Sequence, residues 1–162
     1  MPETHGLSKH PVDVGIRSEA AILGELGKRG YEVLSPFSYN QRYDFVIDLG
    51  DRFLRAQCKT GRVIDGAVSF TKVSVRCSRT SIHRRPYGDE IDLFLVYCPP
   101  LDSVYAIPIA DALGGVCMLR VDPPANNQRK KINWARDYLL GSGERALVAL
   151  PPTPLTLAAA PE

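Results

Sequence analysis

The chain has 162 residues, of which 44% are hydrophobic and 23% are charged, and its formal net charge is +2. This composition is typical of one globular domain that is large enough to bury a hydrophobic core. No apolar run is long enough to span a membrane, and the first residues lack the apolar segment of a secretory leader. The four cysteines stand singly, without the spacing of a zinc site. We therefore expect a cytoplasmic protein with no membrane partner.

The two ends of the chain differ in composition from its middle. Residues 1–12 carry little pattern, and residues 142–162 include a stretch rich in proline and alanine. Such segments bury too little apolar surface to offset the entropy of ordering them. We expect a flexible N-terminus, a folded domain from residue 13 to residue 141, and a flexible tail.

Residues 13–29 are predicted to form an amphipathic helix. Its apolar residues recur at helical spacing and would form the buried stripe, namely Ile16, Ala20, Leu23 and Leu26 or Gly27. Asp13 suits the N-cap position of this helix. Glu19 lies beside the expected stripe, where its carboxylate could face inward.

Alternating polar and apolar residues predict strands at 43–49 and 52–59, with a Gly-Asp turn between them. Residues 91–99 form an almost continuous apolar run and predict a central strand that is buried on both faces. The remaining expected elements are strands at 31–36, 66–75, 102–109 and 116–122, a basic loop at 76–90 and a closing helix at 128–141. This order predicts an α/β or α+β fold with a mixed central sheet flanked by helices.

Polar residues interrupt the apolar pattern at Asp44, Gln57 and Lys59. The period of two places Gln57 and Lys59 on one surface of the strand and sends Cys58 to the other. Polar groups inside a sheet are costly unless they are paired or bound to a metal. Carboxylate and carbonyl oxygens are the ligands that hard divalent cations prefer, and a nearby lysine can assist an attacking water. We predict a phosphodiester-hydrolysing site that binds Mg²⁺ or Mn²⁺ through Glu19, Asp44, Gln57 and the backbone carbonyl of Cys58, with Lys59 beside the water.

Each of these residues also has a simpler explanation. Asp44 could be a turn or cap residue, and Lys59 could be a strand-end lysine that reaches solvent. Glu19 could equally be a solvated helix carboxylate. The shared face of Gln57 and Lys59 favours the functional interpretation, whereas for Glu19 both interpretations stay open.

Positive charge is concentrated between residues 66 and 88, which include five lysines and arginines and no acidic residue. Such a stripe suits phosphate contact, although an isolated basic run is more often a solvated loop. Glu90 and Asp92 follow it and are expected to form ion pairs with the arginines. Asn127 and Gln128 could contact base edges, although a helix-capping loop is the commoner explanation. The predicted DNA-binding residues are Lys72, Arg76, Arg79, Arg84, Arg85, Asn127 and Gln128.

The segments "GELGKRGYEVLSPF", "RYDFVIDLGDRFLRAQCKTGR", "RRPYGDEIDLFLVYCP" and "INWARDY" occur in an order that resembles the PD-(D/E)XK nuclease superfamily, and in particular its group I intron-associated homing endonuclease branch. The resemblance implies a restriction-endonuclease-like core over residues 13–141. It implies that Asp44 and Glu19 bind metal and that Lys59 is the motif lysine. It also implies a nucleoid-associated enzyme that cuts double-stranded DNA as a homodimer or homotetramer.

Gln57 departs from the superfamily pattern, which has Asp or Glu at this position, but it is similar to the Q-x-K pattern of the homing branch. One negative charge fewer at the metal predicts weaker ion affinity. Two alternatives follow from the sequence. The first is a DNA-binding relative that has lost catalysis, and the second is a nuclease of restriction, repair or Holliday-junction resolution with the same fold.

Overall fold

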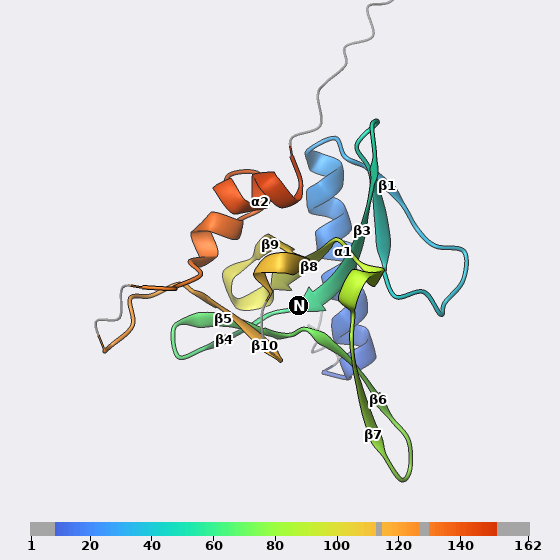
Figure 1. Ribbon diagram of the computed structural model, residues 1–162, viewed down its shortest axis with the longest axis horizontal. Helices are drawn as coiled ribbons and strands as arrows, with labels where there is room; N and C mark the ends of the chain where they lie inside the picture. Colours follow the sequence, from blue (N-terminus) through green and yellow to red (C-terminus); the bar gives the residue numbers. More distant parts are fainter. Residues whose placement is uncertain (1–8, 113–114, 127–129, 152–162) are drawn as a thin grey trace, which may run out of the picture.

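The computed structural model describes residues 9–112, 115–126 and 130–151. A mixed five-stranded sheet forms its centre (Figure 1), with the order β1-β2-β3-β8-β9. β3 and β8 run parallel, and the other neighbours in this sheet are antiparallel. The strands span Glu32–Leu34 (β1), Phe45–Asp48 (β2), Phe53–Thr60 (β3), Leu93–Cys98 (β8) and Ser103–Pro108 (β9). The expected mixed α+β architecture is confirmed.

Both faces of β8 are buried, as its apolar run predicts. Leu93 and Leu95 belong to the core between the sheet and the helices. Phe94 and Val96 point the opposite way, into a second core. That second core is closed by a three-stranded sheet of β4 (Arg62–Ile64), β5 (Ala67–Thr71) and β10 (Val116–Arg120). The central sheet therefore lies between a helical layer and a smaller sheet.

Helix α1 (Pro11–Lys28) packs against β3 and β8 with a different face from the one that its apolar residues predict. Ser18, Ile22 and Leu26 are its buried residues, whereas Ile16 and Leu23 are exposed. Leu26 is therefore buried as predicted, whereas the stripe prediction is wrong at Ile16 and Leu23. The buried face instead includes Ser18, a polar residue whose hydroxyl lies 2.6 Å from that of Thr60. The helix also begins earlier than expected.

The N-cap of α1 is His10, whose side chain accepts a hydrogen bond from the backbone amide of Val12. Asp13 lies inside the first turn, where its carboxylate interacts favourably with the partial positive charge at the N-terminus of the helix. The N-cap therefore lies three residues before the expected one, and the helix begins two residues before its expected start.

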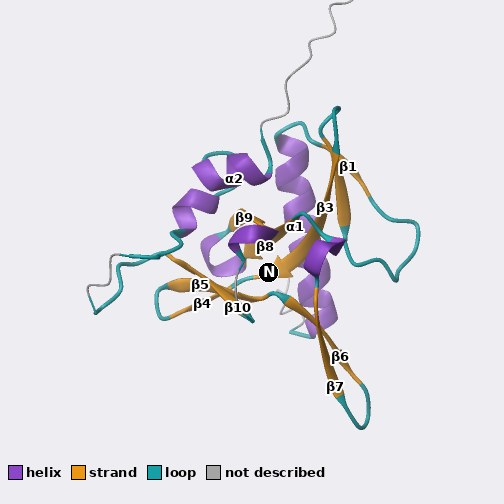
Figure 2. Ribbon diagram, in the orientation of Figure 1, coloured by secondary structure: helices purple, strands orange, loops and turns teal. Residues whose placement is uncertain are grey.

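The expected single strand over 66–75 is interrupted at Lys72, where the chain leaves β5 and enters β6 (Val73–Cys77). β6 pairs with β7 (Ile82–Pro86) in an antiparallel hairpin, which we call the arm. The basic segment expected as a loop is therefore mostly strand. The arm extends away from the rest of the molecule, and Figure 2 shows it as two strands without a helix.

The C-terminal expectations are wrong in two places. Among the described residues of 128–141 there is a single 3₁₀ turn at Ala135–Tyr138 instead of a long helix. Two isolated β-bridges join this segment to strands, one between Trp134 and Arg120 of β10 and one between Leu139 and Tyr105 of β9.

In the expected flexible tail, residues 144–149 form helix α2 (Glu144–Ala149). α2 packs against β9 and supplies Ala146 and Ala149 to the helical core, which Leu150 joins directly after the helix.

The thiols of Cys58, Cys98 and Cys117 are free and buried. Within the described ranges, no helix is both long enough and apolar enough to cross a membrane.

Candidate active site

Asp44 lies immediately before β2, where the β2–β3 ladder ends. Its backbone amide donates to the carbonyl of Ala56 at 2.9 Å. Ala56 pairs with Phe45, the first residue of β2, so Cys58 lies two residues beyond the end of the ladder. The backbone amide of Cys58 therefore has no partner on β2, and it donates to Asp44 Oδ2 at 2.7 Å. The side-chain amide of Gln57 donates to the same oxygen at 2.5 Å. The pairing of two strands therefore fixes the carboxylate in place.

Lys59 follows Gln57 on the same face of β3, as the period of two predicts. Its ammonium donates to the hydroxyl of Tyr87 at 3.0 Å and to the carbonyl of Val73 at 3.4 Å. The ammonium of Lys59 and the carboxylate of Asp44 interact electrostatically, and each shifts the pKa of the other. They therefore belong to one site.

Glu19 joins this site from α1. It lines a cavity of about 200 Å³, whose walls are Gly15, Ser18, Glu19, Cys58, Lys59 and Thr60. Burial and the neighbouring charge of Asp44 both raise the pKa of Glu19. The two carboxylates are therefore close enough to repel each other, and the inward orientation of Glu19 is the one that the structure adopts.

Burial opposes the charge of every ionised group here. Burial raises the pKa of Asp44 more than the Cys58 amide, the Lys59 charge and the Gln57 amide lower it. Burial lowers the pKa of Lys59 more than the charge of Asp44 raises it. A cluster of two carboxylates and one lysine has an excess of negative charge, and a bound cation would relieve it.

The oxygen atoms of this cluster are of the kind that binds a hard divalent cation. Glu19 and Asp44 offer carboxylate oxygens, and Cys58 offers its carbonyl oxygen. Across the described ranges, no three His, Cys, Asp or Glu side chains lie close enough together to hold a metal ion. With an amide at position 57, the site therefore has two acidic side chains, Glu19 and Asp44. The Gln57 Nε2 donates to Asp44 Oδ2 at 2.5 Å and to the Cys58 carbonyl at 3.3 Å. Turning that amide over would offer its oxygen to a cation instead.

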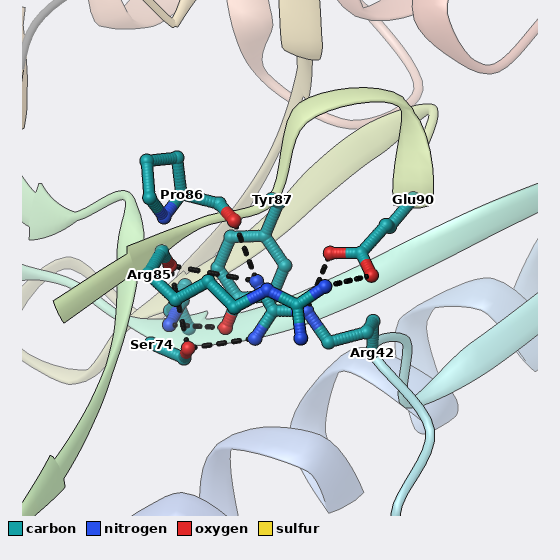
Figure 3. Close-up of polar contacts among 7 residues, drawn as sticks. Arg42, Ser74, Arg85, Pro86, Tyr87 and Glu90 are labelled. Atoms are coloured by element: carbon teal, nitrogen blue, oxygen red, sulfur yellow. Dashed lines mark hydrogen bonds and ion pairs between the residues drawn. The ribbon is translucent and has the colours of Figure 1, made fainter. Parts of the chain in front are cut away.

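Arg42 and Tyr87 are part of this site, although neither is among the site residues that the sequence predicts. Tyr87 is 5% exposed, and its hydroxyl binds Lys59. Arg42 lies two residues before Asp44, and its guanidinium carbon is 4.3 Å from the centre of the Tyr87 ring (Figure 3). The only available signal was the proximity of Arg42 to Asp44 in "RYD", because the contacts themselves are distant in sequence.

The predicted DNA-binding residues lie in several different places. Arg79, Arg84 and Arg85 are exposed on the arm, and Arg85 is ion-paired with Glu90 at 2.7 Å. Lys72 is buried and its ammonium donates to the carbonyl of Ala112, so its assignment to the DNA-binding surface is wrong. The side chain of Arg76 and the residues Asn127 and Gln128 lie outside the described part of the chain.

The two acidic residues after the arm have different partners. Glu90 pairs with Arg42 and Arg85, which confirms its expected role beside the arginines. Asp92 pairs instead with Arg55 on β3, and its carboxylate also accepts the backbone amide of Arg55 at 2.7 Å. These hydrogen bonds and the Arg55 charge outweigh burial and lower the pKa of Asp92, so it is a structural link between β3 and β8.

Comparison with known proteins identifies the family. Among solved structures, the bacterial homing endonuclease I-Ssp6803I matches with a TM-score of 0.65 and 24% identity, over 80% of this chain and 88% of the other. At this identity the likeness shows a common fold. No curated protein sequence matches the chain. The sequence model of the PD-(D/E)XK endonuclease family matches residues 9–141, which include all four predicted catalytic residues, and the chain therefore belongs to that family.

Proposed function

We propose that this chain is a Mg²⁺- or Mn²⁺-dependent endonuclease that hydrolyses phosphodiester bonds in double-stranded DNA and serves in homing. The observation that supports this most directly is the meeting of Glu19, Asp44 and Lys59 in one partly buried site. A homing role agrees with the fold of the bacterial homing endonuclease. Association with a group I intron, assembly as a homodimer or homotetramer and a cytoplasmic, nucleoid-associated location belong to the same proposal.

The chemical roles follow from the position of each group. Asp44 and Glu19, with the Cys58 carbonyl and the Gln57 amide oxygen, would hold the cation, which would supply positive charge to the scissile phosphate. The ammonium of Lys59 would orient the attacking water and stabilise the negative charge that develops during hydrolysis. Burial strengthens both effects, since charges interact more strongly where water is excluded.

The arm is the proposed DNA-binding element. A two-stranded ribbon fits the major groove of B-form DNA. The register pairs Ser74 with Arg85 and Val75 with Arg84, so Arg84 and Arg85 point to opposite faces of the ribbon. Arg84 and Arg79 are free to contact phosphates, whereas Arg85 is held by Glu90. The arm carries no acidic residue between 73 and 86, and thus suits a polyanion along its length.

Two other functions are compatible with this site. The single amide at Gln57 would also suit a DNA-binding relative that has lost cleavage. The same metal cluster would serve a restriction, repair or junction-resolving nuclease, because a fold does not determine its substrate. Comparing the cleavage of linear and branched duplexes distinguishes a junction-resolving nuclease, which would prefer the branched DNA, from a homing enzyme.

The first prediction concerns cleavage itself. Wild-type protein incubated with supercoiled plasmid and Mg²⁺ or Mn²⁺ should nick or linearise it, and EDTA should stop the reaction. Asp44→Ala and Lys59→Ala should each lower the rate by about 100-fold or more, because each removes a group that contacts the reacting phosphate or its water. Undiminished cleavage by either variant contradicts the assigned roles. DNA binding without any cleavage by the wild type identifies the inactive relative.

The second prediction concerns stability. The pKa of Asp44 is raised in the folded state, so the protonated form stabilises the fold and that stability is lost as the pH rises through the folded-state pKa. Asp44→Asn should therefore increase the free energy of unfolding at pH 7 without metal. The gain should disappear below the unfolded-state pKa of about 4, where the wild-type carboxyl is neutral in both states.

Urea unfolding at pH 7 and at pH 3 measures this difference. The control is Asp51→Asn, because the Asp51 side chain is 69% exposed, and little change is expected there. Mg²⁺ should raise the stability of the wild type and leave Asp44→Asn unchanged, since only the folded wild type would bind the ion. A variant less stable than the wild type at pH 7 would show that the carboxylate stabilises the fold.

The third prediction concerns the arm. Arg84→Ala should make the negative slope of log Kobs against log salt concentration shallower by about 1, since one phosphate contact is lost. Fluorescence anisotropy with a labelled duplex in EDTA measures binding without cleavage. Arg52→Ala is the matched control, because Arg52 is also exposed but lies on the turn between β2 and β3. Equal slopes for the Arg84 variant and the wild type would place the DNA on another surface.

A further inference from the structure

The catalytic lysine is held by the base of the arm. Lys59 Nζ donates to the carbonyl of Val73, the first residue of β6, and to the hydroxyl of Tyr87, the residue after β7. Its ammonium is also 5.0 Å from the centre of the Tyr87 ring. Both ends of the arm therefore contact the same side chain.

Tyr87 is fixed from its other side by the core. It is 5% exposed, and its ring packs edge-on against Phe94 with the centroids 5.6 Å apart and an interplanar angle of 84°. Burial raises the pKa of the Tyr87 phenol to about 12, so the group stays neutral and keeps its hydroxyl at physiological pH. A neutral hydroxyl can accept the ammonium hydrogen without adding a charge to the site.

Arg42 lies against the ring of Tyr87 and holds it in place, and Figure 3 shows its guanidinium overlapping the ring. Its guanidinium donates to Glu90 at 2.7 Å, to the carbonyl of Pro86 at 2.7 Å and to the hydroxyl of Ser74 at 2.6 Å. The carbon of the same guanidinium lies over the Tyr87 ring, 4.3 Å from its centre. Arg42 thus joins the segment that carries Asp44 to both strands of the arm.

We propose that Tyr87, clamped by Arg42, is a positioning residue that holds the ammonium of Lys59 in place for catalysis and couples the arm to the active site. This proposal depends on the proposed endonuclease function. A lysine side chain has four rotatable bonds, and holding its end in one place removes a large entropic cost from the reaction. Because the same residues end the arm, DNA bound along the arm would be placed in register with Lys59.

The test is Tyr87→Phe, which removes the hydroxyl and keeps the ring that packs on Phe94 and under Arg42. We expect kcat to fall by about 10-fold while KM and the Kd for DNA stay unchanged, since the lost contact orients Lys59 and binds no DNA. The matched control is Tyr138→Phe, which removes the hydroxyl of another buried tyrosine that donates to Asp111 at 2.9 Å. The control should keep the wild-type kcat.

A kcat within about twofold of the wild type for Tyr87→Phe overturns the proposal. An equal fall in both tyrosine variants overturns it as well, because the effect would then be general destabilisation. Arg42→Lys keeps the charge and loses the planar stack, so it should also lower kcat. The Arg42 effect should shrink when it is combined with Tyr87→Phe, since the clamp acts through that hydroxyl. Full additivity would contradict the coupling.

A second readout does not depend on cleavage. In ¹⁵N-detected NMR of the lysine side chains, the ammonium of Lys59 should be protected from hydrogen exchange in the wild type and in Tyr138→Phe. Tyr87→Phe should accelerate its exchange while the backbone spectrum stays unchanged. If the wild type cleaves no DNA, the endonuclease proposal fails and this measurement still reports whether Tyr87 holds Lys59. Unchanged exchange in Tyr87→Phe refutes the positioning role.

Discussion

The site depends on one carboxylate at the end of a strand ladder. Asp44 Oδ2 accepts the backbone amide of Cys58 and the side-chain amide of Gln57, at 2.7 and 2.5 Å. The pairing of β2 with β3 brings these groups together, and the parallel pairing of β3 with β8 buries them. Once Asp44 is fixed, the alternation of β3 places Gln57 and Lys59 beside it on one face. Helix α1 supplies Glu19 because Ser18 and Ile22 bury the adjoining face against the sheet.

The same arrangement holds charges in an environment that disfavours them. Burial raises the pKa of Asp44 and of Glu19 and lowers that of Lys59. A site that needs these charges for chemistry is destabilising in the free protein, and the surrounding cores must offset that cost. The structural ion pair of Arg55 and Asp92 shows the contrast, since the pKa of Asp92 is lowered and its carboxylate stabilises the fold. Burial thus sets the direction of the pKa shifts of Glu19 and Asp44, whereas the partner's hydrogen bonds and charge set that of Asp92.

Local patterns predicted the central strands and the polar face of β3, because period-two alternation follows directly from strand geometry. They failed where tertiary contacts override composition. Ser18 is buried through its bond to Thr60, and Lys72 is buried through a backbone carbonyl, so neither follows the usual rule for polar residues. Helix α2 lies next to a proline-rich stretch and is held by its packing and by the ion pair of Arg145 with Asp111. The role of Arg42 could not be predicted, since its partners lie 32 to 48 residues away.

We propose that a divalent cation binds Asp44 Oδ2 and the Cys58 carbonyl, the two oxygens that the amide nitrogen of Gln57 bridges. The side-chain amide signals of Gln57 in a ¹⁵N NMR titration with Mg²⁺ test this most directly. We expect a saturable shift of these signals in the wild type, because the cation must displace the nitrogen, and no shift in Asp44→Asn. Signals that stay unmoved at Mg²⁺ concentrations that support cleavage would contradict it.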